Sequence, residues 1–237
     1  MRVRTPSQPG LSYFKTMMVT NTVKRFCLPL RPMAAAALAL ALGTAAACAE
    51  PVDLLKRGGV TLYLRHAQSD WAGEGANTAG ARQLVAGRDC SLERNLTEEG
   101  RADARALGLA LKGLSLKIAD IEAADLCRAI ETARLAFGEP RTIPGIAARD
   151  GAIAPLGAQS AALEKALRPL VAERTLRVII GDYQAAQAMF GLTLAEGEGL
   201  IVKTDASGKA EPLARISISD WRALSPVAAS AAPSRGL

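Results

Sequence analysis

An arginine and the only histidine of the chain stand side by side, as Arg65 and His66, and this pair is the first candidate for chemistry. A guanidinium fork binds two oxygens of a phosphate, and an adjacent imidazole can attack phosphorus or donate a hydrogen bond to it. Taken alone, the pair equally fits a loop histidine that has no role. A single imidazole excludes a histidine-rich metal site, and we expect neither a metal nor a cofactor.

A second cationic residue, Arg128, lies near the start of a helix expected over residues 126–137. Free backbone N–H groups at a helix start favour anions, and an arginine there adds a full positive charge. The alternative is a solvated surface arginine with no partner in a site. Together with Arg65 and His66 it indicates a phosphate pocket, and we include Ser69 among the phosphate-binding residues.

Two compact apolar runs, over residues 60–64 and 176–180, predict buried strands. Arg65-His66 follows the first run, and Gly181-Asp182 follows the second. In open α/β sheets the functional crevice lies at the carboxyl ends of the strands. We therefore place Asp182 in the same site, although the two segments are far apart in the sequence.

Strands that alternate with helices predict an α/β fold, here a three-layer α/β/α sandwich around a mostly parallel mixed sheet. The domain is expected over residues 50–224, followed by a disordered tail over 225–237. The other predicted elements are a helix opening at Thr97, a strand over 118–124, an extended segment over 141–149, helices over 158–172 and 184–190, and closing strands over 200–204 and 213–218.

Four stretches, taken in order, resemble the histidine phosphatase superfamily, also called phosphoglycerate-mutase-like. The first, Leu62-Tyr63-Leu64-Arg65-His66-Ala67, resembles the family's Arg-His-Gly/Ala signature, and the second, Asn95-Leu96-Thr97-Glu98-Glu99-Gly100-Arg101, resembles the opening of its first helix. The third, Leu126-Cys127-Arg128-Ala129-Ile130-Glu131-Thr132-Ala133, resembles the helix that carries the next pocket arginine. The fourth, Val178-Ile179-Ile180-Gly181, resembles the strand that precedes a second histidine. The resemblance implies a phosphoglycerate-mutase-like fold and metal-free chemistry. It also implies that His66 is phosphorylated and then hydrolysed, while Arg65 and Arg128 hold the phosphoryl oxygens.

The sequence departs from the family pattern at Asp182, because the family places its second histidine after that strand's glycine. Asp182 could cap the following helix, pair with Arg65 or Arg128 and close the pocket, or stay protonated and donate a hydrogen bond. The general acid is left open among Glu131, Asp150 and Asp182.

The function expected from this pattern is a weak or atypical phosphomonoester hydrolase that acts through a phosphohistidine at His66. The alternatives are a catalytically inactive pseudo-phosphatase that binds phosphate or a phospholigand, and an envelope protein whose fold serves a protein partner. The expected ligand is phosphate or a small phosphorylated substrate. Nucleic acid is not expected, since no such motif is visible and few aromatic residues could stack on bases. The segment over residues 69–89 could be a substrate lid or a partner surface.

The first 49 residues read as a secretory signal peptide with an upstream extension before Met17, because basic residues precede an apolar run over residues 33–47 and small residues flank Cys48. We therefore expect an exported protein, periplasmic or extracellular, with no stable membrane span after leader removal. An uncleaved membrane anchor and a lipid anchor at Cys48 are the alternatives.

The leader holds six of the 29 basic residues and no acidic residue, so the rest of the chain has 23 basic and 23 acidic residues. The basic isoelectric point is therefore no argument for nucleic-acid binding.

Two cysteines, Cys90 and Cys127, remain outside the leader. In an oxidising compartment such a pair often forms a disulfide. The alternative is two separate buried thiols, because sequence alone does not give the distance between them.

Overall fold

The computed structural model describes residues 50–70, 90, 93–146, 148–149, 152–153 and 155–225. The predicted leader, nearly all of the 69–89 segment and the tail beyond residue 225 lie outside these residues. None of the helices in the described ranges has the length and apolarity that a membrane crossing requires.

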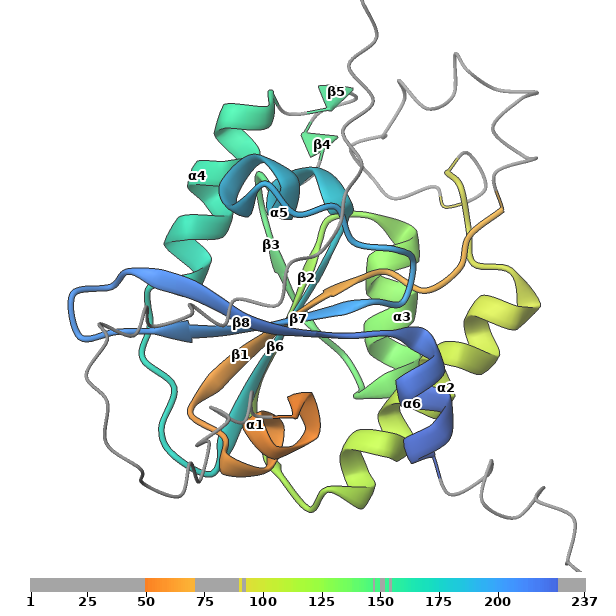
Figure 1. Ribbon diagram of the computed structural model, residues 1–237. Helices are drawn as coiled ribbons and strands as arrows, with labels where there is room; N and C mark the ends of the chain where they lie inside the picture. The colour runs from red at the N-terminus through yellow and green to blue at the C-terminus, as the bar shows by residue number, and fades with distance from the viewer. Residues whose placement is uncertain are drawn as a thin grey trace, which may run out of the picture. The chain divides into compact units, whose positions relative to one another are not determined.

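A six-stranded mixed sheet forms the centre of the domain (Figure 1). Its strands, in spatial order, are β3 (Arg141–Ile143), β2 (Lys117–Ala124), β6 (Thr175–Gly181), β1 (Val60–Arg65), β7 (Gly199–Thr204) and β8 (Ala210–Ile216). The first four are parallel, β7 is antiparallel to β1, and β8 is antiparallel to β7. The mostly parallel mixed sheet predicted from the sequence is confirmed. Strands β1 and β6 are buried almost throughout because both have a neighbour on each side and are covered on both faces, and this explains their continuous apolar runs.

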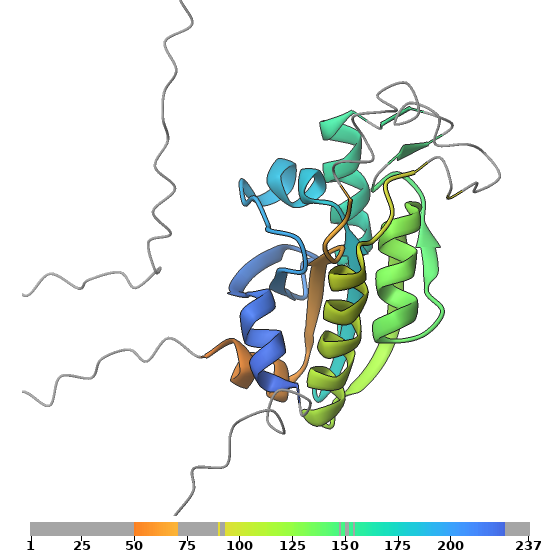
Figure 2. The same cartoon turned by 90° about the vertical axis from the view of Figure 1, so that its right-hand side faces the viewer.

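Helices cover both faces of this sheet. Helices α2 (Glu98–Gly113) and α3 (Cys127–Ala136) pack on one face, with α6 (Ile218–Leu224) against α2, and Figure 2 views the molecule from that side. Helices α4 (Leu156–Leu167) and α5 (Tyr183–Phe190) pack together on the opposite face. For α4, which connects the parallel strands β3 and β6, this is the face that a right-handed crossover requires. The three-layer arrangement is therefore the one predicted.

Four local differences from the sequence prediction have physical causes. Helix α4 ends at Leu167 instead of continuing to residue 172, because Pro169 has no N–H group to extend the helix. The last strand ends at Ile216, because Ser217 caps α6, a short helix that the prediction missed. The short helix α1 (Pro51–Arg57) and the ribbon of β4 (Ala148–Arg149) with β5 (Ala152–Ile153) were also not predicted, since elements this short carry little periodic signal.

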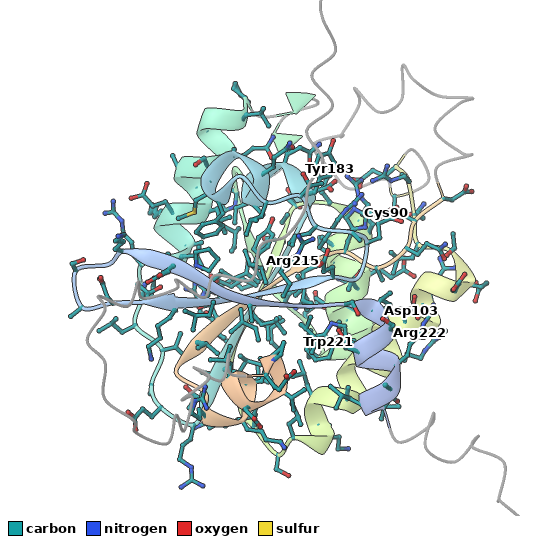
Figure 3. All side chains as sticks on the ribbon, in the orientation of Figure 1. Cys90, Asp103, Tyr183, Arg215, Trp221 and Arg222 are labelled. Carbon is teal, nitrogen blue, oxygen red and sulfur yellow. A yellow bond between two sulfur atoms is a disulfide. The ribbon has the colours of Figure 1, made fainter. Side chains whose placement is uncertain are left out.

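The C-terminal helix α6 is fastened to α2 by both apolar and ionic contacts (Figure 3). Trp221 is fully buried, while Arg222 donates from Nε to Oδ1 of Asp103 at 2.6 Å and from Nη2 to Oδ2 at 2.9 Å. This contact fixes α2, whose first turn follows the segment that enters the candidate site.

Two glycines of α2 make a matched test of how closely α2 and α3 approach. A methyl group at Gly108 would lie 2.2 Å from the backbone oxygen of Ala136, whereas one at Gly113 would meet nothing within 4 Å. We expect Gly108→Ala to lower the free energy of unfolding by about 1–3 kcal/mol through overpacking. Gly113→Ala should leave it unchanged or raise it by up to about 1 kcal/mol, because alanine favours helix. Urea denaturation measures both, and equal losses in the two variants would contradict this packing.

Candidate active site

His66 follows β1 directly, and its side chain is fully buried. Its backbone N–H donates to the carbonyl oxygen of Gly181 at 3.0 Å, which joins the ends of β1 and β6. Its ring Nδ1 lies 2.8 Å from the carbonyl oxygen of Ala67. Because a carbonyl can only accept, Nδ1 carries the proton in a neutral ring and Nε2 keeps its lone pair. The imidazole is thus oriented as a nucleophile through Nε2.

Burial lowers the pKa of the His66 imidazole, and the neighbouring charge of Arg128 lowers it further, although Asp182 acts in the opposite direction. The ring should therefore titrate below the usual value of about 6.5. An NMR titration of protein without a histidine tag tests this directly, since the chain has one histidine and its ring signal needs no assignment.

The free energy of unfolding should also fall as the pH drops below about 6.5, because the unfolded chain then binds a proton at His66 that the folded chain does not. A midpoint at or above the usual value would contradict this description of the ring.

Two predicted arginines, Arg65 and Arg128, both reach the site. Arg65 donates from Nη1 to the carbonyl oxygen of Leu194 at 3.0 Å, and its guanidinium lies over the ring of Tyr183 at 5.0 Å from the centroid. Arg128, in the first turn of α3, donates from Nη2 to Oδ2 of Asp182 at 2.7 Å. Among the described residues, the buried Nε atoms of Arg65 and Arg128 make no hydrogen bond, so each can still donate to an anion.

A third arginine, Arg94, lies in the same site and was missed by the sequence reasoning. Its side chain is only 3% exposed, and its Nη2 lies 3.5 Å from Nε2 of His66 and 3.9 Å from Oδ2 of Asp182. The residues just after it bring it there, since Leu96 forms a β-bridge with Ser69 beyond the end of β1. A signal existed in the sequence, because Arg94 directly precedes the stretch that resembles the opening of the family's first helix.

Asp182 combines two of the three roles considered for it. It caps α5, with Oδ1 accepting from the backbone N–H of Tyr183 at 2.7 Å. It also pairs with Arg128 at 2.7 Å and with Nε of Arg65 at 3.4 Å, and its Oδ1 lies 3.5 Å from Nε2 of His66. Burial alone would raise the pKa of this carboxyl, but the hydrogen bonds and charges around it, with the Arg128 guanidinium among them, outweigh burial and hold the pKa well below its usual range. The carboxyl is therefore ionised, and the interpretation as a protonated donor is wrong for this arrangement.

Ser69 is buried beside the site, but its hydroxyl is directed to an acid rather than to the arginines. Its Oγ donates to Oε1 of Glu196 at 2.6 Å, and the same oxygen lies 3.7 Å from Nη2 of Arg65 and 4.0 Å from Nδ1 of His66. Glu196 was not predicted. It lies on the Nδ1 side of the imidazole, away from the nucleophilic nitrogen.

The other candidates for a general acid do not enter this site. Glu131 accepts from Nε of Arg101, on the neighbouring helix α2, at 2.7 Å, and Asp150 lies outside the described residues. Asp182 is in the site but ionised, so it has no proton to donate at neutral pH.

The predicted disulfide between Cys90 and Cys127 is present, with their Cα atoms 5.7 Å apart. The bond ties the segment that carries Arg94 to the N-terminus of α3. Two hydrogen bonds reinforce it, since Glu93 accepts from the backbone N–H of Cys127 at 2.8 Å and Asn95 donates to the carbonyl oxygen of Cys90 at 2.6 Å.

The loop before β7 is braced from the neighbouring strand β8. Arg215 donates from Nε and Nη2 to the carboxylate of Glu198 at 2.6 Å each, and also to the carbonyl oxygen of Thr193 at 2.7 Å. This bidentate contact fixes the loop that supplies Glu196 and the Leu194 carbonyl. In Figure 3, Tyr183 and Cys90 lie near one end of the sheet, where α5 begins and the disulfide-tethered segment approaches the site.

The described residues of the site form a buried cluster of arginine, histidine and carboxylate side chains that could bind an anion. Among the described residues of the site, three guanidinium groups, of Arg65, Arg94 and Arg128, accompany the carboxylates of Asp182 and Glu196. In the described ranges no group of three or more His, Cys, Asp or Glu side chains is placed to hold a metal ion. The fold and the site together define an α/β protein with a neutral histidine beside three arginines.

Comparison with known proteins agrees with that class. The model of the histidine phosphatase superfamily (branch 1) matches residues 62–147 of the chain. No curated protein sequence matches the chain.

Similar solved structures include the protein histidine phosphatase SixA complexed with tungstate, at 18% identity and a TM-score of 0.48, covering 68% of this chain and 98% of that chain. The protein TTHB049 from Thermus thermophilus has 22% identity and a TM-score of 0.44, covering 67% and 99%. A putative phosphohistidine phosphatase SixA from Agrobacterium tumefaciens has 15% identity and a TM-score of 0.43, covering 67% and 98%.

Proposed function

We propose that this protein is a phosphomonoester hydrolase that acts through a phosphohistidine at His66 and turns over slowly. The observation that carries the proposal is the unprotonated Nε2 of a neutral imidazole, 3.5 Å from Nη2 of the buried Arg94, in a site that also contains Arg65 and Arg128. In-line attack by Nε2 requires that the ring proton be held on Nδ1, as the backbone carbonyl holds it here. A role in phosphate binding alone does not require this.

In the proposed reaction the arginines bind the phosphoryl oxygens and stabilise the charge that develops on them. The Nε2 lone pair of His66 attacks phosphorus, a phosphorus–nitrogen bond forms, and the ester phosphorus–oxygen bond breaks. The leaving oxygen takes a proton from solvent, since Asp182 is ionised. Water then attacks the phosphohistidine, releases phosphate and restores the neutral ring.

Slow turnover follows from the charge of Asp182. Two like unit charges about 4 Å apart repel by roughly 4 kcal/mol at an effective dielectric of about 20. If nothing compensated, that repulsion would slow phosphoryl transfer by about 10³-fold.

A second candidate is a pseudo-phosphatase that binds phosphate or a phospholigand without turnover. The 2.7 Å ion pair between Arg128 and Asp182 favours it, because that carboxylate already engages the arginine that a phosphoryl oxygen would need.

Hydrolysis of a generic aryl phosphate between pH 4 and 8 separates the two candidates, with His66→Ala and Asp182→His measured alongside. We expect the parent to turn over and to give a phosphorylated protein in rapid-quench mass spectrometry under alkaline conditions, and we expect His66→Ala to lose both signals. An inert parent that gains activity in Asp182→His would support the binding protein instead. Turnover that survives in His66→Ala would overturn the assigned nucleophile.

We also propose that the protein is exported and works in an oxidising compartment on a small phosphorylated substrate. The order of basic, apolar and small residues in the first 49 positions supports export, and the Cys90–Cys127 disulfide is typical of such compartments. Fractionation of cells that express the full chain, with alkylation of free thiols, tests both points. A cytoplasmic protein with two free thiols outside the leader would contradict the proposal.

A further inference from the structure

A cavity separate from the candidate active site lies between α4 and the sheet. Its volume is about 710 Å³, within the range of roughly 300–1,000 Å³ that is usual for small-molecule sites. Its lining includes Lys117 and Thr175, the first residues of β2 and β6, whereas His66 and Asp182 follow the carboxyl ends of β1 and β6. A ligand in this cavity would therefore leave the space beside His66 open.

The walls of this cavity are mainly apolar. Strand β3 contributes Ile143, helix α4 contributes Ala162, and the segment after α4 contributes Leu170. Because Pro169 ends α4 just before Leu170, the chain leaves the helix there and lines the cavity. Leu170 is 64% exposed, so a ligand with an apolar body would remove part of its surface from water.

Two arginines and two acids of the lining form one network. Arg177 is buried and donates to the carboxylate of Glu122 and to the carbonyl oxygen of Ala166. Arg141 donates from Nη2 to Oδ2 of Asp120 at 2.6 Å, and the same nitrogen lies 2.7 Å from Oε1 of Glu122. Both acids are therefore paired with an arginine, and their charges are offset toward an incoming ligand.

Two lysines then give the cavity its net charge. Lys117 begins β2 and Lys165 lies in the last turn of α4, so positive charges approach the cavity from the sheet and from the helix that covers it. Among the described residues of the lining, the four basic side chains exceed the acidic ones by two. Apolar walls beside an excess of positive charge favour a ligand that has an apolar body and a negative group.

We propose that this cavity binds a small organic acid, with the apolar body between α4 and β3 and the acid group near Lys117 and Lys165. The proposal is independent of the proposed function, because no residue of the cavity lining belongs to the candidate active site.

Calorimetric titration of the purified protein with octanoate and with naphthoate tests this proposal. We expect at least one of these acids to bind at a single site with a dissociation constant of about 0.1–1 mM, as ligands of this size can. The tighter of the two shows whether the cavity prefers a chain or a ring. Octylamine keeps the chain and reverses the charge, so it should bind at least about 5-fold more weakly than octanoate. Equal binding of octylamine, or no binding of either acid, would overturn the proposal.

Two leucine variants locate the bound acid. Leu170→Asp should weaken binding of the tighter acid by about 10-fold or more, because it removes an apolar contact and adds a negative charge. The matched control is Leu213→Asp, which makes the same change at an exposed leucine of β8 outside the cavity lining and should bind like the parent. Both positions are exposed, so both variants should fold.

Two lysine changes test the charge in the same way. Lys117→Gln combined with Lys165→Gln should weaken binding by about 2- to 10-fold, whereas Lys112→Gln, at an exposed position in α2, should not. Parent-like affinity in either cavity variant, or an equal loss in its control, would overturn the proposal.

Inorganic phosphate distinguishes this cavity from the candidate active site. Saturating phosphate should leave the affinity for the acid unchanged, and competition between the two would place the acid beside His66 and overturn the proposal. A parent that binds the acid but no phosphate would contradict the proposed function alone.

Discussion

Asp182→Asn should bind inorganic phosphate about 10²- to 10³-fold more tightly than the parent while folding less stably. The substitution removes a negative charge that lies 2.7 Å from Arg128 and 3.5 Å from Nε2 of His66, so the repulsion of an incoming dianion disappears. The buried arginines at the same time lose their counter-ion, and breaking one partner of a buried pair typically costs about 3–5 kcal/mol of stability. Asparagine still caps α5 about as well as aspartate does, so the helix start should remain intact.

Calorimetry and urea denaturation, each with and without phosphate, measure these two opposite effects. The matched control is Asp103→Asn, which removes another buried carboxylate, this one paired with Arg222 away from the pocket. It should lose stability without a change in phosphate affinity. Unchanged affinity in Asp182→Asn would mean that the carboxylate does not face the bound anion.

The same variant should change how stability depends on pH. The folded pKa of Asp182 is depressed, so its stabilising contribution is present above the unfolded pKa, near 4, and is lost as the pH falls through the folded value. Asp182→Asn should therefore show a smaller loss of stability than the parent between neutral pH and strongly acidic pH. An identical acid limb in the two proteins would indicate that Asp182 is not the ionised partner described above.

Removing the disulfide by Cys90→Ala with Cys127→Ala should lower the free energy of unfolding by about 4 kcal/mol and weaken phosphate binding as well. A bond that closes a loop over 37 residues restricts the unfolded chain by roughly this amount in the chain-entropy model. The loss of affinity has a separate cause, because the segment bearing Arg94 is no longer fixed beside α3.

A reducing agent should have the same effect on the parent and none on the double variant, which is the control for the reagent itself. Adding Arg94→Gln to the double variant should weaken phosphate binding less than the same change does in the parent, because the two changes act on one group. Fully additive losses would show that the disulfide does not position Arg94.

The sequence by itself determined the sheet and the residues at its ends. The apolar runs that become β1 and β6 predicted strands buried on both faces, and the rule that sites lie at the carboxyl ends of parallel strands then placed Arg65-His66 and Gly181-Asp182 at the same edge of the sheet. Arg128 followed from its position at the start of a helix. These predictions depend on local periodicity and on strand ends, which short stretches of sequence encode.

The tertiary structure alone decided the composition and charge of the pocket. Glu196 reaches His66 because β7 pairs antiparallel with β1, and Arg94 reaches it because a disulfide and a β-bridge fix its segment. Neither pairing has a local signature. The ionisation of Asp182 likewise depends on its distances to charged groups that come from separate segments of the chain. Electrostatic energy falls with distance, and the order of residues in the sequence does not specify these distances.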